Sequence, residues 1–345
     1  MSRFPVLIRS ISPSGEPRFS LGDPLVDSYL EFVGGRCRPT TLRAVAFDLK
    51  TFFGVVAKAP SDVEAADVFD FLAHQRGDRT VVRISDGESG LSARTIARRI
   101  SSISGLYAYL VARGDVGANP VPRGLPTRRR GGRRHLAPLV RVPKTLPSIL
   151  SPDEVDALVG SLRKHRDRAM VFAMLLGGLR RCEVLGLRLS DVQVAERSLF
   201  VADGKGGRQR VVPISNPFFT ELGHYLRAER PQTDTDRLFV TLKGPTRGQP
   251  LGADGVDIVL RSARTRAGLG RATCHQLRHT CLTRLREAGM ALEAVQAQAG
   301  HASLESTRVY LHLTNDWLAA EYHQAAEAID AAAAAELVAI QEVAQ

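Results

Sequence analysis

The sequence predicts a mainly α-helical protein of two domains with a small β-hairpin or sheet in the second domain, which places the whole chain in the α+β class. Three observations support this prediction. The 345 residues, 44% of them hydrophobic, are enough for two domains of roughly 150 residues, each with its own core. Apolar residues recur at helical spacing through most of the chain. A stretch rich in proline, glycine and arginine separates the two halves.

The first half of the chain predicts an all-helical domain over residues 21–117, preceded by a short N-terminal extension over residues 1–20. Apolar residues such as Leu42, Leu49 and Phe52 lie at helical spacing, and Asp and Ser stand where helix N-caps are expected. Four helices are predicted, over Asp23–Phe32, Pro39–Lys58, Ser61–His74 and Ser92–Arg113.

The segment 118–147 is predicted to be a linker that packs no core, because proline, glycine and arginine dominate it. Between Val121 and Thr145 it has no acidic residue, and its basic residues are Arg123, Arg128, Arg129, Arg130, Arg133, Arg134, Arg141 and Lys144. Such a run is either a solvated charged segment or a contact surface for a nucleic-acid backbone.

The second half predicts a domain over residues 148–313. Ser151 at the N-cap, Pro152 at the first helical position and Glu154 form a capping box that starts a helix. Two short β-prone runs, Ser198–Ala202 and Gln209–Ile214, flank a glycine-rich turn and predict a hairpin with Lys205 at its tip. Helices are expected over Asp167–Leu176, Glu183–Leu187, Pro217–Glu229, Gly252–Ala267, Cys274–Ala288, Leu292–Ala299 and, in a tail of residues 314–345, over Asn315–Val343.

Charge and cysteine content narrow the class of protein. The formal net charge is +11 and the pI about 10.0, which indicates a polyanionic partner, either nucleic acid or an anionic membrane surface. No run approaches the roughly 18 to 20 apolar residues of a spanning helix, and residues 1–20 have no apolar signal core, so we expect a cytoplasmic protein with no membrane partner. The cysteines lack metal-ligand spacing, which favours reduced, mostly buried thiols over disulfides or zinc; they are Cys37, Cys182, Cys274 and Cys281.

Five short motifs follow one another through the second domain. They are Gly178-Leu179-Arg180 with Glu183, Gly204-Lys205-Gly206, His275 with Leu277-Arg278-His279, Gly300-His301, and Tyr310. Each motif alone has an ordinary structural explanation. Arg180 could pair with Glu183 one helical turn on, Lys205 could be a polar turn tip, and His301 could cap a helix. Their order, spacing and local context together make chance agreement improbable.

This combination resembles the tyrosine recombinases, or phage integrase family. The match covers about Leu146 to Leu313, and the six active-site positions of the family fall on Arg180, Lys205, His275, Arg278, His301 and Tyr310. The helical first domain resembles the core-binding (SAM-like) domain of the family in layout and basic character. Arg123, Arg128, Arg129, Arg130, Arg133 and Arg134 then become candidates for DNA contact.

The resemblance implies cleavage of a phosphodiester by a tyrosine nucleophile, and the residue chemistry agrees. Two guanidiniums, Arg180 and Arg278, could clamp the non-bridging oxygens without a metal ion or other cofactor. A phenol has a pKa of about 10, so Tyr310 needs their positive field and a proton acceptor, for which His275 is the better candidate. In the family the hairpin lysine, here Lys205, protonates the leaving 5′ oxygen, and His301 hydrogen-bonds the phosphate.

The departures from the family pattern are small. Cys182 stands where serine is common, and Ala299 stands where leucine is common. A thiol nucleophile, Cys182 or Cys274, lacks the spaced histidine and carboxylate partners of acyl-transfer cysteines. Two other functions stay open at this point: a type IB topoisomerase, which relaxes DNA with similar chemistry, and a DNA-binding protein with an inactive site.

The implied partners are duplex DNA with an inverted-repeat core site and further copies of the chain, as a tetramer on that DNA. A second recombinase or an accessory DNA-bending protein could also take part. The tail carries an apolar stripe that includes Trp317, Leu318 and Ile329, and it could dock on its own domain or on a neighbouring protomer.

Overall fold

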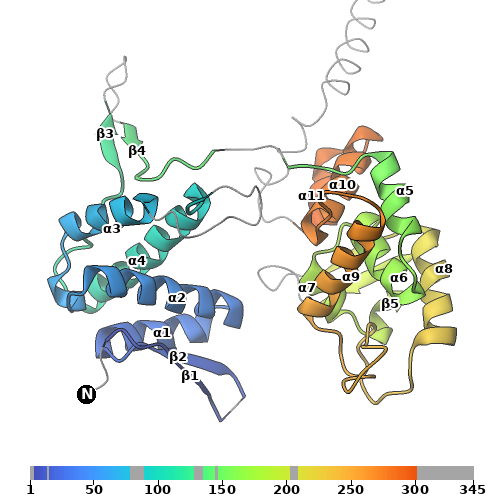
Figure 1. The fold of residues 1–345 in the computed structure, drawn as a ribbon, viewed down its shortest axis with the longest axis horizontal. Helices are drawn as coiled ribbons and strands as arrows, with labels where there is room; N and C mark the ends of the chain where they lie inside the picture. The colour runs from blue at the N-terminus through green and yellow to red at the C-terminus, as the bar shows by residue number, and fades with distance from the viewer. Residues whose placement is uncertain are drawn as a thin grey trace, which may run out of the picture. The chain divides into compact units, whose positions relative to one another are not determined.

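The computed structural model describes residues 4–13, 15–77, 89–127, 135–143, 147–202 and 209–300. The chain divides into two compact units, Met1–Lys144 and Thr145–Gln345, each with its own core (Figure 1). None of the helices described in either unit is long and apolar enough to cross a membrane.

The described part of the N-terminal unit contains four α-helices, as predicted. They are α1 (Pro24–Arg36), α2 (Pro39–Val56), α3 (Ala65–Gly77) and α4 (Ala93–Arg113). The side chains of Asp23 and Ser92 cap α1 and α4 by accepting backbone N–H groups. Helix α1 runs beyond its predicted end through two glycines, because Val33 packs into the core. Helix α3 starts later than predicted, because Pro60–Asp62 forms a separate 3-10 turn, η1.

Aromatic and aliphatic side chains from all four helices form the core of this unit. Phe52 and Phe71 are fully buried and meet edge to face, with ring centroids 5.1 Å apart. The Tyr107 hydroxyl donates to the Pro60 carbonyl at 3.0 Å. One carboxylate, Asp48, is also buried, and its oxygen accepts from Arg98 at 2.5 Å and from Ser102 at 2.8 Å, so α2 and α4 are joined by a charged contact as well as by packing.

Two hairpins flank the helical domain, one in the predicted N-terminal extension and one in the predicted linker, and the prediction that the linker packs no core is wrong. Strands β1 (Ile8–Ile11) and β2 (Pro17–Ser20) pair antiparallel, and Leu21 directly after β2 is fully buried. Strands β3 (Leu125–Thr127) and β4 (His135–Ala137) pair within the expected linker. Val121 is buried, and the core also receives Leu139 and Val140, so both ends of the linker segment contribute to packing.

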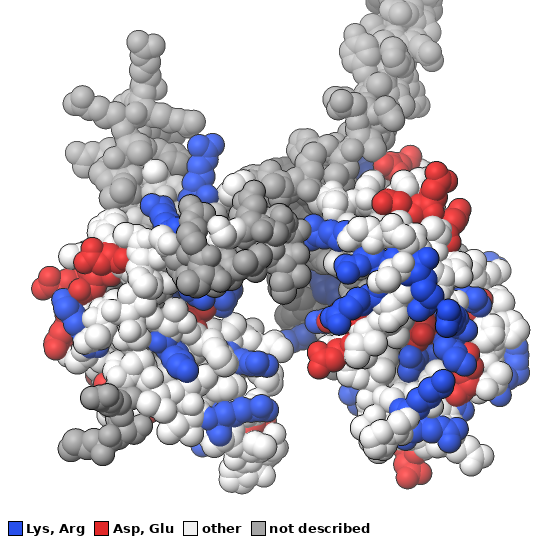
Figure 2. Space-filling view, viewed as in Figure 1, with Lys and Arg blue, Asp and Glu red and all other residues white. Residues whose placement is uncertain are grey.

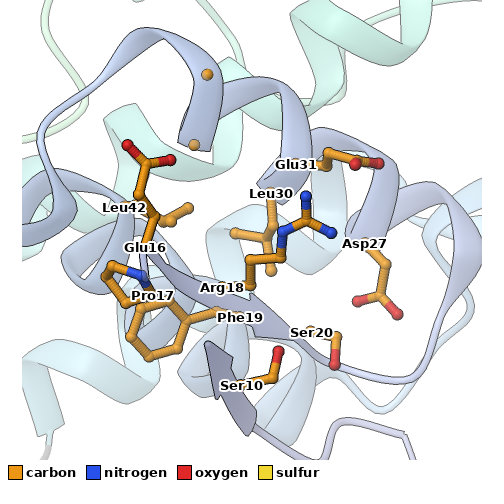
Figure 3. A pocket seen from close by; sticks show the side chains of 12 residues that line it. Ser10, Glu16, Pro17, Arg18, Phe19, Ser20, Asp27, Leu30, Glu31 and Leu42 are labelled. Carbon is orange, nitrogen blue, oxygen red and sulfur yellow. The ribbon is translucent and has the colours of Figure 1, made fainter. Parts of the chain in front are cut away.

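A hollow of about 430 Å³ lies where the first hairpin faces α1 and α2. Figure 3 shows Arg18 projecting from β2 into this hollow, with the carboxylates of Glu16, Asp27 and Glu31 around it. Asp27 is already engaged, since it accepts from the backbone amides of Leu21 and Gly22. The hollow therefore holds a mixed set of charges.

The C-terminal unit is built around one buried helix, α6 (His165–Leu175), against which α8 (Asn216–His224) and α10 (Cys274–Glu287) pack. Most of the apolar residues of α6 are buried, which is typical of a helix at the centre of a core. The other α-helices described here are α5 (Pro152–Gly160), α7 (Arg181–Gly186), α9 (Ala253–Arg266) and α11 (Leu292–Ala299). Helix α8 continues as a π-helical turn, η3 (Tyr225–Glu229), and a 3-10 turn, η2 (Leu189–Asp191), follows α7.

The capping box and the hairpin of this unit are confirmed. The Ser151 hydroxyl accepts from the Glu154 amide at 3.2 Å, and the Glu154 carboxylate accepts from the Ser151 amide at 2.9 Å. Strands β6 (Ser198–Val201) and β7 (Arg210–Pro213) pair antiparallel, and a third strand that the sequence did not predict, β5 (Val192–Gln193), joins β6. The tip with Lys205 and the tail helix expected over Asn315–Val343 lie outside the described residues.

Candidate active site

A hollow of about 420 Å³ in the C-terminal unit brings together residues that are far apart in the sequence. Its walls come from the start of α7, the start of α10 and the exposed side of α9. The lining residues are Arg180, Arg181, Cys182, Asp257, Thr273, Cys274, His275 and Arg278. Three of the six predicted active-site residues, Arg180, His275 and Arg278, therefore face one space. Lys205, His301 and Tyr310 lie outside the residues that the structure describes.

A tight glycine turn before α7 sets the position of Arg180. Gly178 has φ +66°, a conformation that side chains disfavour, and a Cβ on Gly177 would lie 2.9 Å from the Ala173 carbonyl oxygen. The chain can therefore turn directly from α6 into α7, with Arg180 at the N-cap. Its side chain is 20% exposed, so most of it is covered by the protein while it still lines the hollow.

Glu183 is the buried centre of this site. Its carboxylate accepts from the Arg180 guanidinium and the Arg180 amide, both at 2.8 Å, and from the two terminal nitrogens of Arg210 at 3.0 and 2.9 Å. Burial by itself would raise the pKa of Glu183, but the hydrogen bonds and charges of Arg210 and Arg180 outweigh it and lower the pKa from 4.5 to about 2. Arg180 does pair with Glu183, the partner that its spacing allowed, and this pairing holds the guanidinium at the edge of the hollow.

Arg278 reaches the same place from α10 and is almost fully buried, with 2% of its side chain exposed. Its guanidinium donates to the carbonyl oxygens of Gly178 and, at 2.6 Å, of Ala299. A terminal nitrogen lies 3.9 Å from the Glu183 carboxylate. Arg278 thus joins the glycine turn, α10 and the end of α11, and the planar guanidinium is held by acceptors on different elements.

His275 lies on the first turn of α10, where the Thr273 side chain caps the helix. The imidazole is exposed and packs edge to face on His279, with ring centroids 4.3 Å apart. His275 and Arg278 lie three residues apart on α10 and line the same hollow, as side chains at this spacing on one helix face can.

Arg210 on β7 is a site residue that sequence reasoning missed. Besides its two bonds to Glu183, its Nε donates to the Gln298 carbonyl at 3.2 Å. Gly300, which ends α11 with φ +58°, has no Cβ, and a Cβ there would lie 3.0 Å from the Arg210 guanidinium. The sequence shows only an arginine next to the predicted hairpin tip. Its partners, Glu183 and Gln298, lie far away in the sequence and could not be inferred from it. Arg210 therefore links the Glu183–Arg180 pair to the end of α11, shortly before position 301.

Comparison with known proteins decides the family. Residues 148–316 match the Phage integrase family, and residues 26–114 match the Phage integrase, N-terminal SAM-like domain. The tyrosine recombinase XerC of Roseiflexus castenholzii is 30% identical over 292 residues, covering 80% of this chain and 84% of the relative. The tyrosine recombinase XerD of Listeria monocytogenes is 28% identical over 319 residues, covering 87% and 97%. This chain belongs to the phage integrase family of tyrosine recombinases.

Solved structures share the fold of this tyrosine recombinase. The Tn1549 transposon integrase, in complex with circular intermediate DNA, aligns with a TM-score of 0.62 at 18% identity, covering 87% of this chain and 99% of the integrase. The XerH recombinase, bound to its palindromic difH substrate, aligns with a TM-score of 0.60 at 21% identity, covering 84% and 82%. The predicted mainly helical fold with a small sheet is confirmed.

The cysteines of the recombinase are all free, but the prediction that they are mostly buried is wrong. Cys37 and Cys182 are exposed, Cys274 is half-buried and only Cys281 is buried. Burial raises the pKa of the Cys274 thiol to about 11 and that of Cys281 to about 12. Both thiols are therefore protonated near neutral pH, which argues against Cys274 as a nucleophile.

The linker arginines of the recombinase are described only in part. Arg123 is exposed at the start of the segment, whereas Arg128, Arg129, Arg130, Arg133 and Arg134 lie outside the described ranges. No group of three or more His, Cys, Asp or Glu side chains in those ranges could hold a metal ion.

Glu183→Gln is expected to lower the free energy of unfolding at neutral pH by about 3 kcal/mol, because Arg180 and Arg210 lose a buried counter-charge. Since folding lowers the pKa from 4.5 to about 2, the carboxylate stabilises the fold above pH 4.5, and this contribution is lost as the pH falls through about 2. Calorimetric melting of the full chain across this pH range measures the effect. Asp236→Asn, at a carboxylate that is 56% exposed, is the control with little expected change. An identical pH dependence in the original chain and Glu183→Gln would contradict the assignment.

Proposed function

We propose that this protein is a site-specific DNA recombinase that cuts and rejoins strands through a 3′-phosphotyrosyl intermediate on Tyr310. Exchange of one pair of strands would give a Holliday junction, and exchange of the second pair would resolve it. The observation that best supports the proposal is the convergence of Arg180 and Arg278 on one hollow, each held by hydrogen bonds. Integration, excision, transposition and resolution all fit this chemistry.

The two arginines would bind the non-bridging oxygens of the scissile phosphate. Negative charge on these oxygens grows in the pentacoordinate transition state, and fixed cationic donors stabilise it without reorganising at that moment. Arg278 has this preorganisation because its guanidinium is held by two carbonyl oxygens in the core. Arg180 has it through Glu183.

The remaining groups would move protons and form the covalent bond. His275, exposed at the rim of the hollow, would accept the phenolic proton as Tyr310 attacks phosphorus and the bond to the 5′ oxygen breaks. Lys205 would protonate that oxygen, and His301 would hydrogen-bond the phosphate. The energy of the phosphodiester is kept in the phosphotyrosyl bond, so the strands can be rejoined without ATP.

The N-terminal unit would be the core-binding domain, and the basic linker would follow the DNA backbone between the domains. The match of residues 26–114 to the N-terminal domain of the family supports this assignment. The net charge of +11 supports a polyanionic partner.

Replacing Arg128, Arg129 and Arg130 by alanine is expected to weaken binding to all duplexes alike. Each lost phosphate contact should lower the slope of log affinity against log salt by about 0.9. Fluorescence anisotropy at several salt concentrations measures this slope. An unchanged slope would mean that these arginines are solvated in the complex.

The active form would be a tetramer on an inverted-repeat site, in the cytoplasm, with a second recombinase or a DNA-bending protein as possible further partners. A groove of about 520 Å³ in the C-terminal unit, with apolar residues among those that line it, supports docking of the tail. Leu175, Ile214, Leu285 and Met290 line it. The apolar stripe of the tail would fill this groove, in the same protomer or in a neighbour.

Capture of covalent protein–DNA adducts from cells that express the chain, with sequencing of the attached DNA, tests the proposal. Adducts that cluster at one inverted-repeat sequence would support site-specific recombination. Scattered adducts would favour a type IB topoisomerase. No adducts, together with retained DNA binding, would favour a binding protein with an inactive site.

A further inference from the structure

Arg181, directly after Arg180, is a further cation in the active-site hollow that the six-residue set leaves out. It lies at the first position of α7 and lines the hollow beside Arg180 and Arg278. Within the described residues, the Arg181 side chain forms one ion pair, with Asp257 on α9, and Nη1 and Oδ2 lie 2.5 Å apart.

This ion pair differs from the contacts that hold the other two arginines. The side chains of Arg181 and Asp257 are 40% and 48% exposed, whereas Glu183 is fully buried and Arg278 nearly so. Exposed ion pairs contribute little to stability, because water and salt screen them. A phosphodiester at the hollow could therefore compete with Asp257 for Arg181, while the buried pairs would stay intact.

The charges around the hollow favour an anion. Among the described residues, the lining contains three arginines and one carboxylate, Asp257. Lys and Arg side chains spread over the face of the C-terminal unit seen in Figure 2, including the region of α9. If Arg180 binds the scissile phosphate, the nearest further anion for Arg181 is an adjacent phosphate of the DNA.

We propose that Arg181 binds a DNA phosphate next to the scissile one, and that Asp257 holds Arg181 in the DNA-free chain and so weakens DNA binding. This inference rests on the proposed function. It predicts that removing Arg181 and removing Asp257 have opposite effects on DNA affinity. A purely structural pair would give the same effect, a loss of stability, whichever member is removed.

The test uses fluorescence anisotropy with a labelled duplex that carries the cleavage site recovered from adduct mapping. Arg181→Ala is expected to weaken binding and to lower the salt slope by about 0.9, the value for one phosphate contact. Asp257→Asn is expected to tighten binding about 1.4- to five-fold, the range for release from one exposed ion pair. In the Arg181→Ala background, Asp257→Asn should have a smaller effect, because no arginine is left to release.

The pair Arg188–Asp236 is a matched control. Its Nη1 and Oδ2 atoms also lie 2.5 Å apart, its side chains are 51% and 56% exposed, and neither residue lines the hollow. Arg188→Ala and Asp236→Asn should not show opposite effects on binding. Melting temperatures of all variants show whether each one remains folded.

Three outcomes would overturn the inference. These are an unchanged salt slope in Arg181→Ala, weaker binding in both single variants with equal losses in melting temperature, or equal tightening by Asp257→Asn with and without Arg181. Adduct formation by the unaltered chain on the same duplex distinguishes failure of this inference from failure of the proposed function. Adducts with any of these outcomes remove only the role of Arg181, whereas the absence of adducts removes the proposed function and the inference together.

Discussion

Tyr310→Phe is expected to keep DNA affinity and to lose all covalent protein–DNA adduct. The phenylalanine ring retains the size of the side chain, but it has no oxygen to attack phosphorus, so cleavage through this residue cannot begin. Denaturing gel electrophoresis after incubation with the mapped duplex measures the adduct, and anisotropy measures affinity. Tyr109→Phe is the matched control, because within the described residues the Tyr109 hydroxyl makes one long contact, 3.5 Å, to the Ser28 carbonyl oxygen and accepts one hydrogen bond from Arg113.

Adduct that survives in Tyr310→Phe would remove Tyr310 from the nucleophile role. Adduct lost together with DNA affinity would instead indicate that the change had damaged the fold or the binding surface. Tyr109→Phe should form adduct at the original rate. A loss there would show that the assay responds to changes outside the active site.

Arg180→Lys and Arg278→Lys are each expected to lower the rate of strand cleavage by about 10² to 10³-fold. Lysine keeps the positive charge but loses the planar fork that can bind two oxygens at once. The lysine variants are preferable to alanine at position 278, because alanine would leave a cavity and the buried carbonyls of Gly178 and Ala299 without their donor. Single-turnover cleavage of the mapped duplex measures the rate.

Arg230→Lys is the matched control for these variants. The Arg230 guanidinium also donates to two backbone carbonyls, those of Thr235 and Arg237 at 2.9 and 3.0 Å, but it does not line the hollow. It should lose similar stability and keep the cleavage rate. If cleavage fell equally in all three variants, in proportion to melting temperature, the arginines would be structural and the proposed clamp would be wrong.

Local sequence signals predicted most of the helices because those signals act over a few residues. The capping box at Ser151 and Glu154 marks a helix start that depends only on its own side chains. The hairpin β6–β7 followed from two β-prone runs and a glycine-rich turn. Predictions failed where packing overrode composition. Leu139 lies in a segment of proline, glycine and arginine, and it nevertheless packs against the core of the N-terminal unit.

The candidate site was predicted in part. The motifs and their family resemblance singled out Arg180, His275 and Arg278, and the structure brings these three to one hollow. The sequence did not indicate Arg210, because an arginine in a short strand is ordinary until its partner is known. That partner, Glu183, was interpreted only as a neighbour of Arg180.

The sequence by itself determined the family, the class of fold and the types of residue available for the chemistry. Those properties are carried by local spacing and by the order of motifs along the chain. Only the tertiary structure decided that Arg180 and Arg210 share the Glu183 carboxylate, how deeply Arg278 is buried, and that Arg181 remains partly exposed beside the hollow. The physical reason is that these properties depend on burial and on contacts between α7, α10 and β7, which lie far apart in the sequence and meet only when the core forms.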